Sequence, residues 1–293
     1  IYTFTPVQHP ANDMTTDIIT THFDYHSIDH NLLKLDILGH DDPTIIRTLE
    51  EYITSDAMEN EYNEEHPFVA TSIPLDDPKV LSLFHDTSAL GIAPEDIGGC
   101  PLGCLGVPEF GTDFVIQMVQ DAKPQSLSDL IRISGLSHGT NVWLGNAQDL
   151  VKSGIATIST AICTRDDIMI YLINKGVDSA LSFTIMESVR KGKGLKPEWE
   201  VAMKEKDVPD WYIDSCKKIS YMFPKAHAAA YVMMAYRIAY CKINYPLAYY
   251  GAYFGIRADA FSYEIMCQGK DKLNDYIQDY KKRSDSLSKK EQD

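Results

Sequence analysis

From residue 75 onward, helical segments alternate with Gly- and Pro-rich loops, and this alternation constrains the fold more than any other feature. Asp76-Asp77-Pro78 and Pro94-Glu95-Asp96 each place a proline beside acidic residues, which predicts a helix start. Further helices are predicted near residues 110–121, 126–134, 140–151, 165–174, 178–191, 197–206, 209–221 and 226–244. The predicted class is therefore mainly α.

The first 40 residues differ from the rest and predict a small α/β piece. Leu32 to Leu38 is an apolar, strand-like run that ends at Gly39. A helix start follows, because Asp41 or Asp42 can cap it and Pro43 suits its first turn. After Gly269 the chain becomes rich in Lys, Asp and Ser, which predicts a frayed helix or the beginning of another domain.

Composition bounds the function without deciding it. The 293 residues are 44% hydrophobic, enough for one or two cores, and no apolar run approaches the ~20 residues of a membrane span. Residues 1–150 carry 5 basic against 24 acidic residues (−19), and residues 151–293 carry 22 against 18 (+4). The charge therefore neither supports nor excludes a polyanionic partner. Six scattered cysteines suggest reduced thiols in the cytoplasm, and the missing initiator Met suggests a piece of a longer chain.

Two groups of residues near the N-terminus are candidates for metal chemistry. His22, His26 and His30 would share one face of a helix, although exposed histidines near a strand are the plainer interpretation. Asp36 is a lone acid between apolar residues, which is costly to bury unless it is paired or binds a metal. Sequence chemistry leaves a structural and a catalytic role for Asp36 equally open. Cys100-x3-Cys104 is a weaker metal candidate, because no second pair of ligands follows at a fitting distance.

Residues 133–140 combine small residues with the donors Ser137 and His138. The segment is either a ligand-binding turn or simply a turn between helices. Residues 188–194 place Arg190, Lys191 and Lys193 beside two glycines, which suits a polyphosphate. A basic helix C-terminus would explain the same pattern.

Residues 221–231 form a further candidate anion site. Lys225 and His227 stand at a predicted helix N-terminus, which attracts anions, and Tyr231 lies one turn after His227. Tyr221 precedes the turn. These groups suit the phosphates, sugar and base of a nucleotide, but the tyrosines could equally belong to the core.

These segments, with Pro108–Thr112, Trp143–Ala147 and Arg165–Met169, occur in the order found in one family. From about residue 1 to 268 the chain resembles the family-C replicative DNA polymerases, specifically the Gram-positive PolC type of DNA polymerase III alpha subunit. The resemblance implies that residues 1–40 are the C-terminal end of a polymerase beta-like palm. It makes residues 41–268 the fingers and residues 269–293 the start of a following domain. Asp113, Ile116 and Cys104 depart from the family pattern.

The resemblance also implies a DNA-directed DNA polymerase that transfers a dNTP onto a primer 3′-hydroxyl with two Mg²⁺ ions. Asp36 matches one of three metal-binding carboxylates, and an Asp-x-Asp pair expected upstream of Ile1 would supply the others. This chain should therefore bind the incoming nucleotide but not catalyse alone. The residues implied for nucleotide binding are Ser137, His138, Arg165, Arg190, Lys191, Lys193, Tyr221, Lys225, His227 and Tyr231.

The expected partners are primer-template DNA and dNTP in the cytoplasm, with the sliding clamp and other replisome proteins bound through regions outside this chain. No membrane partner is expected. A separately encoded nucleotide- or DNA-binding module of a split polymerase is an alternative. A metal-dependent hydrolase built on the three histidines and Asp36 is a more distant one.

Overall fold

The computed structural model describes residues 1–35, 37, 39–55, 57–257 and 262–288. It divides the chain into two compact units, Ile1–His40 and Asp41–Asp293. In the described residues, no helix is both long and apolar enough to cross a membrane.

The first unit contains little regular structure. Strands β1 (Val7–Gln8) and β2 (Thr20–Thr21) pair antiparallel, with Val7 opposite Thr21. Short 3₁₀ turns follow each strand, at Pro10–Asn12 and Tyr25–Ser27.

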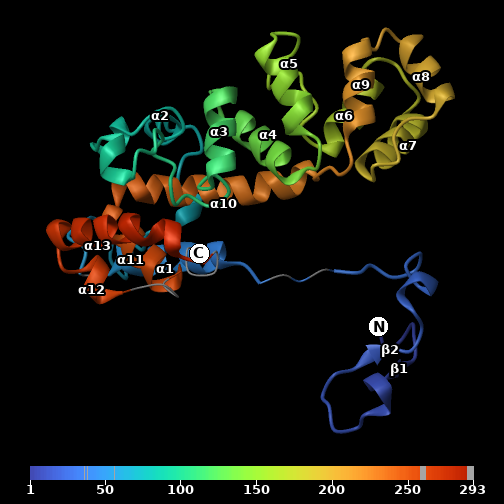
Figure 1. The fold of residues 1–293 in the computed structure, drawn as a ribbon. Helices are drawn as coiled ribbons and strands as arrows, with labels where there is room; N and C mark the ends of the chain where they lie inside the picture. The colour runs from blue at the N-terminus through green and yellow to red at the C-terminus, as the bar shows by residue number, and fades with distance from the viewer. Residues whose placement is uncertain (36, 38, 56, 258–261, 289–293) are drawn as a thin grey trace. The chain divides into compact units, whose positions relative to one another are not determined.

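The second unit is helical (Figure 1). Its helices are α1 (Asp41–Thr54), α2 (Pro78–Ser82), α3 (Asp113–Ala122), α4 (Leu127–His138), α5 (Gln148–Lys152), α6 (Arg165–Asn174), α7 (Ser179–Arg190), α8 (Pro197–Lys204), α9 (Asp210–Lys218), α10 (Lys225–Asn244), α11 (Pro246–Arg257), α12 (Tyr263–Met266) and α13 (Lys270–Arg283). The mainly helical class with a small N-terminal sheet is therefore confirmed.

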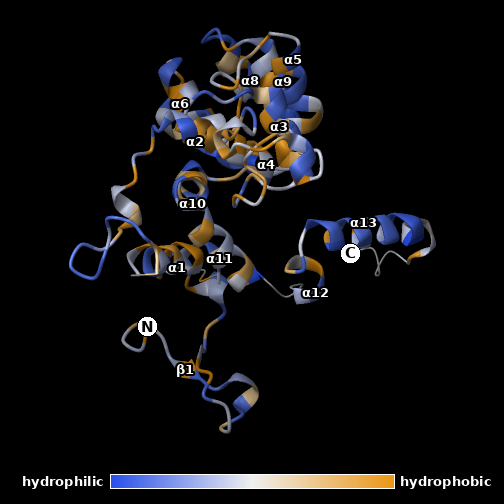
Figure 2. Ribbon diagram, turned by 90° about the vertical axis from the view of Figure 1, so that its left-hand side faces the viewer, coloured by the Kyte–Doolittle hydropathy of each residue, from blue (hydrophilic) through white to orange (hydrophobic). Residues whose placement is uncertain are grey.

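Helix α10 organises the second unit because it contributes to two hydrophobic cores. Val232, Ala235 and Tyr236 pack into a core that α2, α3, α4, α6, α7 and α9 complete. Ile238 and Cys241 pack into a second core with α1 and α11. Small alanines on α10 let neighbouring helices approach closely, and the hydropathy colouring shows apolar residues along several of the helices (Figure 2). Pro246 then starts α11, where a missing backbone N–H costs little.

Buried Lys242 joins α10 to the Gly- and Pro-rich loop at residues 98–108. Its Nζ donates to the carbonyl oxygens of Gly103 (2.8 Å) and Leu105 (2.5 Å). Burial lowers the pKa of Lys242 to about 8. The ammonium thus satisfies two loop carbonyls at the cost of its own desolvation.

Several sequence predictions are wrong in detail. The described residues of Leu32–Leu38 form no strand; Leu33 and Leu35 are exposed, and a strand needs a partner for its backbone hydrogen bonds. The helix expected at 140–151 is a π-helical turn at Trp143–Ala147 followed by α5. The helix expected at 209–221 ends at Lys218, because the next residues pair with another segment.

The three N-terminal histidines do not share a helical face. His22 follows β2 and lies 2.7 Å from Gln8 Oε1 through Nδ1, His26 belongs to a 3₁₀ turn, and His30 is exposed. Cys104, the second residue of the weak cysteine pair, is buried in the first core. Burial raises the pKa of its thiol to about 12, which opposes a metal-binding thiolate.

Candidate nucleotide site

Residues 220–223, here called the central segment, lie extended between α9 and α10. Pro224 disfavours helical geometry in the residue before it, which keeps the chain extended up to the start of α10. Thr140, just after α4, pairs with this segment: its N–H donates to Tyr221 O (2.9 Å), and its carbonyl accepts from Ser220 N (3.1 Å). The end of α4 is therefore attached to the start of α10.

The central segment also holds the ends of α6 and α7. Arg165 N, at the start of α6, donates to Phe223 O (3.1 Å). Met222 N donates to the carbonyl of Arg190, at the end of α7 (3.3 Å). Backbone hydrogen bonds thus bring four segments, distant in sequence, to one place.

A row of rings runs from α4 onto α10. His138 stacks on Phe223 (centroids 4.8 Å apart), and Phe223 meets His227 edge-on at 4.6 Å. His227 in turn stacks on Tyr231 at 4.3 Å, as expected for residues one helical turn apart. This aromatic row offers π surfaces beside the N-terminus of α10.

Glu109 fixes the first ring of the aromatic row. Its carboxylate lies 3.3 Å from His138 Nε2 and accepts a hydrogen bond from Ser134 Oγ at 3.2 Å. His138 Nδ1 lies 2.7 Å from the Ser134 carbonyl oxygen, which can only accept, so Nδ1 carries a proton. Ser137 Oγ donates to the same carbonyl (3.0 Å). The imidazole is therefore held at both nitrogens.

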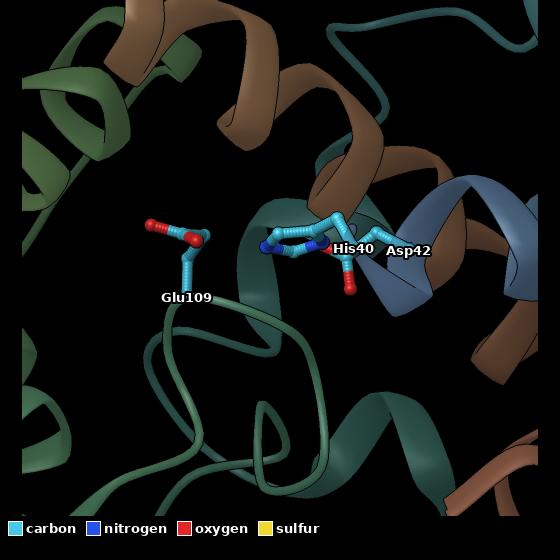
Figure 3. A group of neighbouring side chains, drawn as sticks. All are labelled: His40, Asp42 and Glu109. Carbon is cyan, nitrogen blue, oxygen red and sulfur yellow. The ribbon is translucent and has the colours of Figure 1, made fainter. Parts of the chain in front are cut away.

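Figure 3 shows Glu109 on the loop before α3, with Asp42 at the start of α1. Both belong to the second unit, whereas His40, drawn with them, belongs to the first. Glu109 has φ +69°, a left-handed conformation that is rare for a non-glycine residue. Such backbone strain persists only where the surrounding contacts hold it.

Glu187 pairs with two of the predicted cations. It binds the Arg190 guanidinium with both oxygens, and Lys191 Nζ lies 2.9 Å from Oε2. The Arg190 hydrogen bond, helped by Lys191, lowers the pKa of the Glu187 carboxyl to about 2. Two cations at the C-terminus of α7 are thereby held in place by one carboxylate.

Lys225 is held by the first turn of α6. Its backbone N donates to Asp166 Oδ2 (2.7 Å), and its Nζ lies 3.6 Å from Asp167 Oδ1. Arg165 and Lys193 make no ion pair among the described residues. Lys193 lies between Gly192 and Gly194, both at φ +69°, in the turn that leaves α7.

Among the ten predicted nucleotide residues, Tyr221 belongs to the central segment and Lys225 follows it at the start of α10. Arg165 and Arg190 hydrogen-bond to the segment through their backbones, and His138 and His227 contact its Phe223. Ser137 and Lys191 are the sequence neighbours of His138 and Arg190, and Tyr231 stacks on His227. Lys193 follows Gly192, whose backbone lies against Ser220: a Cβ added at Gly192 would lie 2.5 Å from Ser220 O. Asp36, the predicted catalytic and metal residue, lies outside the described residues.

Sequence reasoning missed the anions of the site and Phe223. Glu187 had a usable signal, because it stands three and four residues before Arg190 and Lys191 on a predicted helix. Glu109, by contrast, reaches His138 across 29 positions of sequence, and no local spacing indicates that contact.

Comparison with known proteins shows which family the chain resembles. Residues 42–207, more than half of the chain, match the model of the bacterial DNA polymerase III alpha subunit finger domain. The chain belongs to this family. It is 55% identical to the DNA polymerase III PolC-type of Clostridium perfringens strain 13 over 291 residues, and 54% identical to that of Bacillus subtilis strain 168. It is 53% identical to that of Staphylococcus aureus strain NCTC 8325 over 293 residues.

These matches cover 99–100% of the chain but 19% of each relative. The resemblance to the PolC type is therefore confirmed, and the chain spans about a fifth of the length of the relatives. The finger-domain match includes the ends of α4, α6 and α7, which meet at the central segment.

Proposed function

We propose that this finger domain binds the incoming deoxynucleoside triphosphate in replicative DNA synthesis. The observation that carries the proposal is the junction at the central segment, where α4, α6, α7 and α10 bring cations and rings together. The PolC-type relatives are named as DNA polymerases, which supports the same class of substrate.

The triphosphate would lie near the cations of α6, α7 and the N-terminus of α10. Arg190, Lys191 and Lys193 can bind phosphate oxygens from the α7 side, and Arg165 and Lys225 can bind them from the α6 side. Glu187 and Asp167 form ion pairs with three of these cations, Arg190, Lys191 and Lys225. A triphosphate would compete with those carboxylates, and the positive end of α10 favours the anion.

The base and sugar would lie along the aromatic row. Tyr221 is 43% exposed, so its ring is available to a ligand. Stacking on the rings of His227 and Tyr231 tolerates any of the four bases, as a replicative polymerase requires. Ser137 and His138 supply hydroxyl and imidazole groups at the other end of the row.

The two Mg²⁺ ions of the proposed reaction need more oxygen ligands than this site supplies. Mg²⁺ prefers carboxylate oxygens in octahedral geometry, but Glu187, Asp166 and Asp167 already accept bonds from protein groups. In the complete polymerase we assign Asp36 and an Asp-x-Asp pair as their ligands, by resemblance to the family.

Primer-template DNA and dNTP are the proposed substrates, in the cytoplasm. The sliding clamp and other replisome proteins would bind the complete polymerase elsewhere. The palm assignment of residues 1–40, the fingers boundary at 41–268 and the tail at 269–293 remain predictions.

Binding of dNTP to this chain tests the proposal. Arg190→Ala and Lys193→Ala should each weaken dNTP binding about 10-fold, since each removes one charge-assisted phosphate contact. Lys206→Ala, which removes an exposed cation beyond α8, is the matched control and should change nothing. Isothermal titration with each dNTP measures the affinities. Equal affinities in all four proteins would remove these cations from the site.

Primer extension separates binding from catalysis. With Mg²⁺ and four dNTPs, the chain alone should extend no primer, whereas a version extended upstream through the palm should do so. Extension by the chain alone would show that the proposed need for further carboxylates is wrong.

A further inference from the structure

Glu109 is an acid that is largely removed from water. Its side chain is 11% exposed, and its carboxylate accepts a hydrogen bond from Ser134 Oγ at 3.2 Å. A buried carboxylate is costly unless a positive charge compensates it, and one hydroxyl does not suffice. Among the described residues of the second unit, the basic group within ion-pair distance of Glu109 is the His138 imidazole. His138 is therefore the group that has to balance the charge of Glu109.

A second buried acid increases the need for a positive charge. Asp42, at the start of α1, is fully buried, and one of its oxygens lies within 4.8 Å of a Glu109 carboxylate oxygen (Figure 3). The Arg257 guanidinium of α11 lies 3.4 Å from Asp42 Oδ1. Neighbouring carboxylates repel each other unless each meets a cation. Because Arg257 pairs with Asp42, a protonated His138 would complete the balance at Glu109.

The position of the imidazole calls for a proton on each of its nitrogens. Nδ1 of His138 lies 2.7 Å from the carbonyl oxygen of Ser134, which only accepts, so Nδ1 carries a proton. In a neutral imidazole, Nε2 would then hold a lone pair and would meet the Glu109 oxygen at 3.3 Å, one acceptor facing another. A proton on Nε2 turns this repulsion into the attraction of an ion pair.

We propose that His138 is an imidazolium at neutral pH, kept protonated by Glu109, and that its proton controls the affinity of the site for a nucleoside triphosphate. The His138 side chain is 37% exposed, so solvent water can take up the Nε2 proton as the pH rises. Glu109 then stays behind as an unbalanced anion beside the aromatic row, and it repels the triphosphate. Only this effect on affinity rests on the proposed dNTP binding; the protonation of His138 does not.

Glu109→Gln tests the protonation of His138 without any nucleotide. The amide keeps the size of the carboxylate, can accept from Ser134 Oγ and can donate to an unprotonated Nε2, so the variant should fold. Long-range ¹H–¹⁵N NMR at pH 7.5 should show both His138 nitrogens protonated in the wild-type chain, and Nε2 unprotonated in Glu109→Gln. A spectrum of His138→Asn assigns the signals among the nine histidines. Exposed Glu95→Gln, in the short turn at Pro94–Ile97, is the matched control and should leave these signals unchanged.

Isothermal titration with a dNTP at pH 7.5 and pH 9 measures the effect on affinity. The phosphates are ionised at both values, so the charge of the ligand stays constant. The loss of affinity between the two values should be about 3-fold larger in the wild-type chain than in Glu109→Gln, in which no anion is left behind.

Other groups titrate in the same interval, but they are common to both proteins. Lys242, which holds the loop before Glu109, has a pKa of about 8, and His227 of α10 contacts the same Phe223 ring as His138. A His40→Gln background removes the last histidine of the first unit from both proteins. The difference between the two pH profiles therefore belongs to Glu109 and His138.

A neutral His138 in the wild-type chain at pH 7.5 overturns the proposal, as does an imidazolium that persists in Glu109→Gln. Equal pH profiles of dNTP affinity in the two proteins overturn the control of affinity. If neither protein binds a dNTP, the proposed function is wrong and the control of affinity falls with it, whereas the nitrogen signals still decide the charge of His138.

Discussion

At the scale of single residues, the candidate site is a set of basic side chains and one imidazole ring, each held by a carboxylate. Glu187 holds Arg190 and Lys191, Asp167 holds Lys225, and Glu109 holds His138. Each acid keeps a flexible basic side chain or ring in one position before any ligand arrives. Such positioning lowers the conformational entropy that a ligand would otherwise have to remove.

Glu187→Gln should lower the free energy of unfolding by about 1–2 kcal/mol at pH 7, allowing for solvent screening of the pair. The pKa of Glu187 is depressed to about 2 in the folded protein, from an ordinary value of 4.5. Its contribution is therefore present above pH 4.5 and is lost as the pH falls toward 2.

Urea denaturation at pH 7 and pH 3 measures this difference. Exposed Glu64→Gln, in the loop after α1, is the control and should be neutral at both values. A difference between wild type and Glu187→Gln that does not shrink at pH 3 would contradict the ion-pair explanation.

At the scale of elements, the site depends on how helices end. The turn after α7 brings Gly192 against the central segment: a Cβ at Gly192 would lie 2.5 Å from Ser220 O, and φ is +69°. Gly194 has the same φ, but nothing lies within 4 Å of its Cβ position. A substitution at Gly194 would thus introduce backbone strain alone, whereas one at Gly192 would introduce the same strain and a steric clash.

Gly192→Ala should destabilise the domain by more than about 2 kcal/mol, whereas Gly194→Ala should cost about 1 kcal/mol. The larger effect arises because the clashing atom is the backbone oxygen of Ser220, which cannot move without disturbing the central segment. Chemical denaturation measures both, and dNTP titration of Gly192→Ala should show weaker binding. Equal destabilisation by the two substitutions would mean that the clash is relieved locally.

Local sequence patterns predicted most helices and the grouping of Lys225, His227 and Tyr231, because helical spacing alone places these residues near each other. They did not predict α11, which follows α10 after a single residue. They also failed for Leu32–Leu38, because a strand depends on a partner elsewhere. Thr140 meets Tyr221 and Glu109 meets His138 across long sequence separations, so tertiary packing decides these contacts.

At the scale of the whole second unit, two cores share one helix. The three tryptophans, Trp143, Trp199 and Trp211, all belong to or pack against the first core. The second core, with Leu49 of α1, contains none of them. Tryptophan fluorescence therefore reports on one core, while circular dichroism reports on the helices of both.

Leu49→Ala should lower the unfolding free energy by about 2–5 kcal/mol, as expected for a fully buried leucine. Because α10 is shared, the urea midpoint seen by tryptophan fluorescence should fall together with that seen by circular dichroism. An unchanged fluorescence midpoint, with a separate early transition in circular dichroism, would show that the two cores unfold independently.

The shared helix also has a mechanical consequence. Its 20 residues make a rod about 30 Å long, with Lys225 at one end and the α1–α11 core around the other. A tilt of about 5° imposed at the α11 end would move the Lys225 end by about 2.6 Å, roughly the length of one hydrogen bond. A change in the position of α11 would thus be transmitted along α10 to the residues proposed to hold the nucleotide.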